Sequence, residues 1–92
     1  MKIEFDAVKD TANIAKHGIS LAVAEGFDFD SMVSRIDNRK DYGEVREIAL
    51  GFIDGRLHIL VYTRPGNARR IISLRKANAQ ERKLYNASQI KN

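Results

Sequence analysis

The chain has 92 residues, no cysteine and a formal net charge of +4 at neutral pH. This length suits a single domain with a modest core, which we expect to span residues 1–92. Without cysteines the chain can form neither a disulfide framework nor a thiolate metal site. No stretch approaches the roughly 20 apolar residues of a membrane span, so we expect a cytoplasmic protein without a membrane partner.

The charges are divided unevenly between the two halves of the chain. Residues 1–46 hold seven Lys or Arg against nine Asp or Glu, a net charge of −2. Residues 47–92 hold nine against three, a net charge of +6. A basic half beside a nearly neutral one predicts a one-sided basic surface and an anionic partner. A small domain that happens to be basic near its C-terminal end is the alternative.

The first half of the chain predicts a short strand and two helices. Alternating side chains over residues 2–5 indicate the strand. Asp6 can cap a helix over residues 7–17, because a carboxylate there accepts hydrogen bonds from free backbone N–H groups. Ser20 can cap a second, shorter helix over residues 21–26. Four apolar residues of the first helix region recur at helical spacing and predict a narrow apolar face: Val8, Ala12, Ala15 and Ile19.

From Ser31 onward the apolar period changes to two, which predicts strands. Their expected ranges are 31–37, 46–53, 56–64 and 69–76. A terminal helix should follow and end near Ala87. Because short turns join successive strands, the sheet should be mainly antiparallel. The expected class is α+β, with two N-terminal helices packed on one face of the sheet and a C-terminal helix.

Alternation divides the side chains of residues 56–64 between two faces of the sheet. The more apolar set consists of Leu57, Ile59, Val61 and Thr63. The helices should cover this set, which leaves Tyr62 and Arg64 on an open face of the sheet.

Four cations surround three core aliphatic residues in the sequence RRIISLRKA, residues 69–77. Strict alternation places Arg69 on the same face as Arg75, and Arg70 on the same face as Lys76. The centre of this strand should serve the core, while its cations lie on an open sheet surface. Single cations can also block edge-to-edge strand pairing or cover apolar surface with their stems. The set as a whole favours contact with phosphate groups.

Neither a metal site nor a cofactor site is predicted. His17 and His58 lie in distant segments, and no glycine loop for phosphates or Gly-x-Ser-x-Gly nucleophile turn occurs. RNA cleavage by the substrate's own 2′-hydroxyl requires neither, since the protein need only move protons and stabilise a pentacoordinate phosphorane. Arginine suits the second task because its guanidinium binds phosphate oxygens bidentately. The residues that could share these roles are His17, Tyr62, Arg64, Arg75 and Tyr85. His17 is equally suited to be a cation at a helix C-terminus.

Five ordered segments are similar to a known family: KHGIS (16–20), DYGEVR (41–46), LVYTR (60–64), RIISLRKA (70–77) and ERKLY (81–85). They resemble the BrnT family, toxins of bacterial type II toxin–antitoxin systems. The resemblance implies a RelE-like ribonuclease fold and an RNA-cleaving toxin that inhibits translation. It also implies a BrnA-like antitoxin that binds the toxin and carries the operator-binding domain, with a heterotetramer on operator DNA as the expected assembly.

The resulting hypothesis is an endoribonuclease of the mRNA interferase type. Arg64 and Arg75 would stabilise the phosphorane, and His17 would act as an acid or base. The RNA-binding residues are expected to be Arg46, Tyr62, Lys76, Arg82 and Tyr85. Two alternatives stay open at this point. One is a non-catalytic RNA- or DNA-binding module that uses the same basic sheet face, and the other is a protein-interaction domain that docks an acidic segment.

Overall fold

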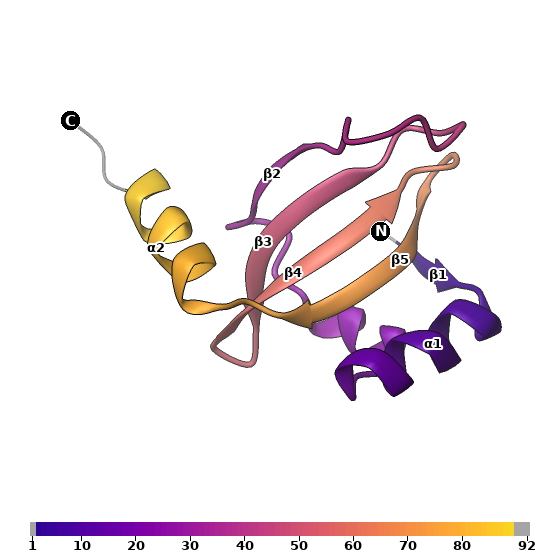
Figure 1. Cartoon of the computed structure of the whole chain (residues 1–92), viewed down its shortest axis with the longest axis horizontal. Coiled ribbons are helices and arrows are strands. Elements are labelled where there is room, and N and C mark those ends of the chain that lie inside the picture. Colours follow the sequence, from indigo (N-terminus) through magenta and orange to yellow (C-terminus); the bar gives the residue numbers. More distant parts are fainter. Residues whose placement is uncertain (1, 90–92) are drawn as a thin grey trace.

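The computed structural model describes residues 2–89 and places five strands in one mixed sheet. The elements in chain order are β1 (Lys2–Phe5), α1 (Ala7–His17), the 3₁₀ helix η1 (Leu21–Gly26), β2 (Val33–Ile36), β3 (Glu47–Ile53), β4 (Arg56–Thr63), β5 (Ala68–Lys76) and α2 (Ala79–Ser88) (Figure 1). The strand order is β1-β5-β4-β3-β2, in which β1 runs parallel to β5 and the other neighbours are antiparallel. The α+β class and the C-terminal helix are confirmed. The second predicted helix, over residues 21–26, is a 3₁₀ helix rather than an α-helix, so the prediction of two N-terminal helices packed on the sheet is not confirmed.

One face of the sheet is covered by η1 and forms the main core. The fully buried side chains on this face include Leu60 and Tyr62 of β4 and Leu74 of β5. They belong to the same apolar cluster as Leu21 and Ala24 of η1. The cap predicted for this segment is present, because the Ser20 side chain accepts a hydrogen bond from the backbone of η1. We refer to this side of the sheet as the core face.

The prediction of which β4 side chains the helices cover is therefore wrong. The core face carries Tyr62, and the more apolar set lies on the opposite side: Leu57, Ile59 and Val61. A tyrosine ring contributes a large apolar surface to a core. Counting tyrosine as a polar residue, as the comparison of the two β4 faces did, therefore underestimates how readily it is buried. Tyr62 packs edge-on against Phe29, with the ring centroids 6.1 Å apart.

A bulge in β5 determines which face each of its cations occupies. Val61 pairs with Ser73 and Tyr62 pairs with Ile71, so Ile72 is an extra residue in the ladder. An extra residue reverses the alternation on either side of it. Arg69 consequently lies on the core face, and Arg70 shares the opposite face with Arg75. The prediction that Arg69 lies on the same face of the sheet as Arg75 assumed strict alternation and is wrong.

The helix α1 lies along the edge of β5 rather than on the face of the sheet. β1 pairs only with the first part of β5, up to Ile71. Beyond that point the side chain of Asn13 takes the place of a strand: its Nδ2 donates to the carbonyl of Leu74 at 2.9 Å, and its Oδ1 accepts from the Leu74 N–H at 3.1 Å. Asn13 is the buried residue of α1, whereas Val8 is 77% exposed. The apolar face predicted for this helix is therefore wrong, because the helix attaches through an amide.

The helix α2 contacts the opposite face near the β3–β4 hairpin, far from α1 in Figure 1. Tyr85 is buried there among apolar residues that include Leu57 and Ile59, and its hydroxyl donates to the carbonyl of Ser31 at 2.8 Å. The ring of Tyr85 lies edge-on to Phe52, at a centroid distance of 5.2 Å. Within residues 2–89, no helix has the length and apolar character needed to cross a membrane.

Candidate active site

A groove of about 750 Å³ crosses the part of the sheet that α2 leaves uncovered. Its floor consists of aliphatic side chains, most of them half-buried: Val33, Ile48, Leu50, Ile59, Val61 and Ile72. The helix α1 contributes residues along the β5 side, and Arg35 and Arg39 contribute from the β2 side. Glu81 and Leu84 of α2 also line it. The groove is thus built from segments that are far apart in the sequence.

Among the ionisable side chains that line the groove, basic ones predominate: Lys9, Lys16, His17, Arg35, Arg39 and Arg75. Lys9 and Lys16 lie seven positions apart in α1 and so occupy one side of that helix. Glu81 is the one carboxylate that lines the groove among the described residues. A concave surface with this excess of positive charge attracts polyanions such as RNA.

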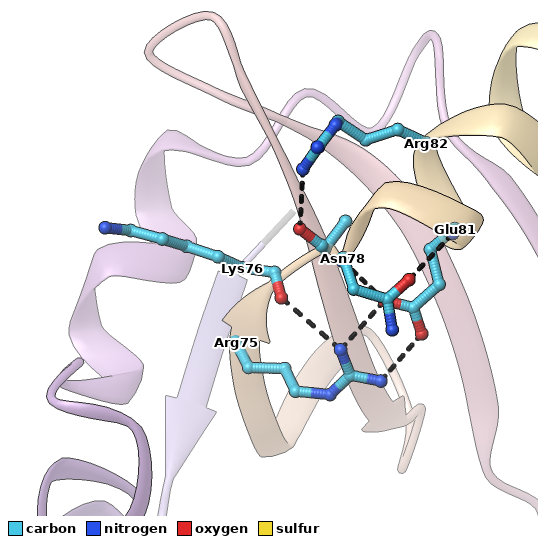
Figure 2. Close-up of polar contacts among 6 residues, drawn as sticks. Arg75, Lys76, Asn78, Glu81 and Arg82 are labelled. Atoms are coloured by element: carbon cyan, nitrogen blue, oxygen red, sulfur yellow. Dashed lines mark hydrogen bonds and ion pairs between the residues drawn. The ribbon is translucent and has the colours of Figure 1, made fainter.

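Arg75 projects from β5 into the groove and is held by Glu81 at the start of α2 (Figure 2). Its Nη1 donates to Oε1 of Glu81 at 2.9 Å and its Nη2 donates to Oε2 at 2.8 Å. Nη1 also contacts the carbonyl of Lys76 at 3.3 Å. The hydrogen bonds of this pair raise the pKa of Arg75 and lower the pKa of Glu81. Both side chains are therefore charged at neutral pH.

His17 is the last residue of α1 and lines the same groove. Partial burial lowers the pKa of its imidazole, and the positive charges of Lys16 and Arg75 lower it further. The imidazole is consequently neutral at pH 7, the form that accepts a proton. This direction argues against His17 as a helix C-terminal cation. Two of the predicted catalytic residues, His17 and Arg75, thus lie within electrostatic reach of each other.

The proximity of these two side chains can be tested by titration. Replacing Arg75 with glutamine should raise the pKa of His17, because one of the charges that opposes protonation is removed. The measurement is an NMR titration of the His17 imidazole. Arg56→Gln serves as the control, since Arg56 is exposed in the β3–β4 hairpin outside the groove, and it should leave that pKa unchanged. An unchanged His17 pKa in Arg75→Gln would show that the two groups are not close.

Arg39 is a groove residue that was not predicted from the sequence. Its Nε and Nη2 each donate to a carboxylate oxygen of Asp37 at 2.8 Å. Asp37 is only 4% exposed and also accepts from the Tyr42 hydroxyl at 3.0 Å. The hydrogen bonds from Arg39 lower the pKa of Asp37. The spacing of Asp37 and Arg39 within a polar loop was the one available signal, and it does not reveal where the arginine points.

The structure does not bring Arg64 and Arg75 together. Arg75 pairs with Ile59 of β4 across the ladder, and Arg64 follows Ile59 by five residues in the chain. At the rise of an extended strand, the backbones of Arg64 and Arg75 are therefore about 16 Å apart along the strand direction. Arg64 is exposed and lines a separate hollow of about 220 Å³. Arg46 lies at the same end of the sheet, since it directly precedes β3, and its guanidinium stacks on the ring of Tyr42 at 4.0 Å.

The remaining predicted RNA-binding residues lie outside the groove. Tyr62 is 0% exposed, and burial, followed by Glu47, raises the pKa of its hydroxyl to about 12. Tyr85 is 5% exposed, so neither tyrosine can stack on a base. Lys76 is exposed but belongs to the core-face side of β5, where it pairs with His58. Arg82 donates to the carbonyl of Ala77 at 3.2 Å, beside a hollow under α2.

The fold and the groove define a small α+β protein with one basic groove, which is lined by His17 and by an arginine that a carboxylate holds in place. Residues 5–81 match the family model described as the ribonuclease toxin, BrnT, of type II toxin–antitoxin systems. The chain therefore belongs to the BrnT family, and the resemblance noted in its sequence is confirmed. No curated protein matches the chain. The matched region includes His17, Arg75 and Glu81 and ends before Arg82 and Tyr85.

Proposed function

We propose that the groove is the active site of an endoribonuclease of the mRNA interferase type that requires no metal ion. The observation that carries this proposal is that His17 and Arg75 line the same basic groove, in which burial and then the charges of Lys16 and Arg75 lower the pKa of His17. Neutral His17 accepts the proton of the substrate's 2′-hydroxyl. The 2′-oxygen then bonds to the adjacent phosphorus, and the bond to the 5′-oxygen breaks.

The other steps follow from the charges in the groove. Arg75 stabilises the negative charge that accumulates on the phosphorane oxygens. The proton held by His17 passes to the departing 5′-oxygen, so the products are a 2′,3′-cyclic phosphate and a 5′-hydroxyl. The lysines and arginines at the rim bind phosphates on either side of the cut and so fix the position of the RNA. They are Lys9, Lys16, Arg35 and Arg39.

Arg64 has a different role in this proposal from the one expected from the sequence. Because it lies about 16 Å from Arg75 along the strand direction, it binds the RNA backbone at a distance from the cut, with Arg46 at the same end of the sheet. In the cell, cleavage of mRNA inhibits translation. A BrnA-like antitoxin, expected as a heterotetramer with the toxin on operator DNA, neutralises the activity. The support for such a partner is the family's description as a type II toxin.

The chemistry of the new RNA ends tests this mechanism. After induction of the protein in a bacterium, we expect growth arrest and new RNA fragments that begin with a 5′-hydroxyl, which can be ligated and sequenced only after phosphorylation. His17→Ala should remove these ends, and the exposed Arg56→Ala should retain them. Ends with a 5′-phosphate would contradict attack by the 2′-hydroxyl. New ends that persist in His17→Ala would exclude this residue from the chemistry, and soluble protein without new ends would favour the binding-module alternative.

A further inference from the structure

The guanidinium of Arg75 is only partly occupied by its protein partners. An arginine has five N–H groups. Glu81 accepts a hydrogen bond from one N–H of Nη1 and from one N–H of Nη2, and the carbonyl of Lys76 accepts from the second N–H of Nη1. Within residues 2–89, no acceptor bonds the Nε–H or the second Nη2–H. These two N–H groups lie on the same edge of the guanidinium, which is an edge that can bind two phosphate oxygens.

Glu81 is itself held in place from two directions. Its Oε1 accepts from the backbone N–H of Asn78 at 2.9 Å, and its own N–H donates to Oδ1 of Asn78 at 2.8 Å. This reciprocal capping box fixes the first turn of α2 (Figure 2). Tyr85, one turn further along α2, anchors the helix to the sheet. The carboxylate is therefore rigid, and so is the guanidinium that it holds.

We infer that Glu81 is a positioning residue for RNA cleavage: it fixes the guanidinium of Arg75 with the Nε/Nη2 edge left open for the phosphate. This inference rests on the proposed function. A flexible arginine would have to be ordered during each catalytic cycle, whereas a fixed one stabilises the transition state without that cost. Since Glu81 binds the Nη1/Nη2 edge, it does not compete with phosphate for the other edge.

The test compares steady-state cleavage by the wild-type protein and Glu81→Gln, both made by cell-free synthesis. The substrate is an RNA that contains a cut site mapped after induction. Glutamine keeps the shape of the side chain but offers one acceptor oxygen to Arg75 instead of two. We expect kcat to fall about 10- to 100-fold, as observed when outer-shell partners of other sites are removed, while KM changes less than about threefold.

Two control variants separate positioning from helix stability. Asn78→Ala removes the side-chain cap of α2 but leaves both bonds between Glu81 and Arg75 and the bond from the backbone N–H of residue 78 to Oε1 of Glu81. It should therefore lower the Tm with a smaller loss of kcat than Glu81→Gln. Glu25→Gln makes the same chemical change at an exposed position of η1, outside the groove, and should have no effect. Faster cleavage by Glu81→Gln would overturn the inference, because the carboxylate would then block Arg75.

An unchanged kcat in Glu81→Gln would also overturn it and would leave Glu81 with a role in capping alone. Arg75→Ala, measured in parallel, distinguishes this failure from a failure of the proposed function. If Arg75→Ala loses activity and Glu81→Gln does not, only the role of Glu81 is wrong. If Arg75→Ala cleaves as fast as the wild type, the proposed function of the groove is itself wrong, whatever the result for Glu81→Gln.

Discussion

Replacing Arg75 with alanine should lower the rate of RNA cleavage by about 10³-fold, the loss typical of removing a donor that stabilises a transition-state charge. The side chain lines the groove with its guanidinium fixed and one edge unpaired, whereas the other cations of the groove are assigned to phosphates on either side of the cut. In a growing culture, induction of this variant should no longer cause arrest. The measurement is the initial rate of cleavage of a mapped RNA site, together with the growth curve.

The control for this prediction is Arg56→Ala, which removes the same charge from the β3–β4 hairpin, where Arg56 is exposed. It should retain cleavage within about twofold, since a rim or surface charge mainly affects encounter with the RNA. A rate for Arg75→Ala within tenfold of the wild type would mean that the phosphorane is stabilised elsewhere. Arg64, at the far end of β4, would then be the next residue to replace.

The local elements were largely predictable from the sequence because their signals are local. Asp6 caps α1 as expected, and its Oδ1 accepts the N–H of Val8 at 2.6 Å. The left-handed Gly18 ends that helix, with φ of 72°. The ends of all five strands fall within two residues of the predicted ranges, and β2 shows the largest difference. Caps, turns and alternation each depend on a few neighbouring residues, so a single sequence suffices to detect them.

The faces of the strands were not predictable in the same way. The bulge at Ile72 inverts the alternation along β5, and nothing in the local sequence marks it. As a result Arg69, expected on the open surface, is 9% exposed, and its guanidinium lies 3.7 Å from the ring centroid of Phe29. The same bulge places Arg70 and Arg75 on one face. A single extra residue therefore decides on which face of the sheet each of the four cations of this segment lies.

The composition of the site was partly predictable, and its geometry was not. His17 and Arg75 were predicted as catalytic candidates, and they line the same groove. Arg64 was grouped with Arg75 because both are arginines suited to binding phosphate and both lie in segments that resemble the family, but the antiparallel register separates them along the sheet. Arg39 and Glu81 were missed as site residues, because their relevance depends on contacts between side chains. Such contacts follow from tertiary packing and leave no periodic pattern in the sequence.

Replacing Asn13 with alanine should lower the free energy of unfolding by about 2–4 kcal/mol, because a buried N–H and a buried carbonyl of Leu74 each lose their partner. The same change removes the 2.8 Å bond from Asn13 to the carbonyl of Ile19, which holds the turn after α1. Since α1 is attached to β5 through this amide, Lys16 and His17 should also leave the groove, and cleavage should fall with stability. Urea denaturation gives the free energy, and the RNA assay gives the rate.

Thr11→Ala is the matched control, because Thr11 is an exposed residue of α1 whose hydroxyl donates within the helix, to the carbonyl of Ala7. It should change the free energy of unfolding by less than about 0.5 kcal/mol. Asn13→Asp gives a sharper comparison: it can still accept the N–H of Leu74, but its second oxygen would face the carbonyls of Leu74 and Ile19. It should therefore be at least as destabilising as alanine. If both Asn13 variants unfolded like the wild type, α1 would be held to the sheet by other contacts, and the position of His17 in the groove would need a different explanation.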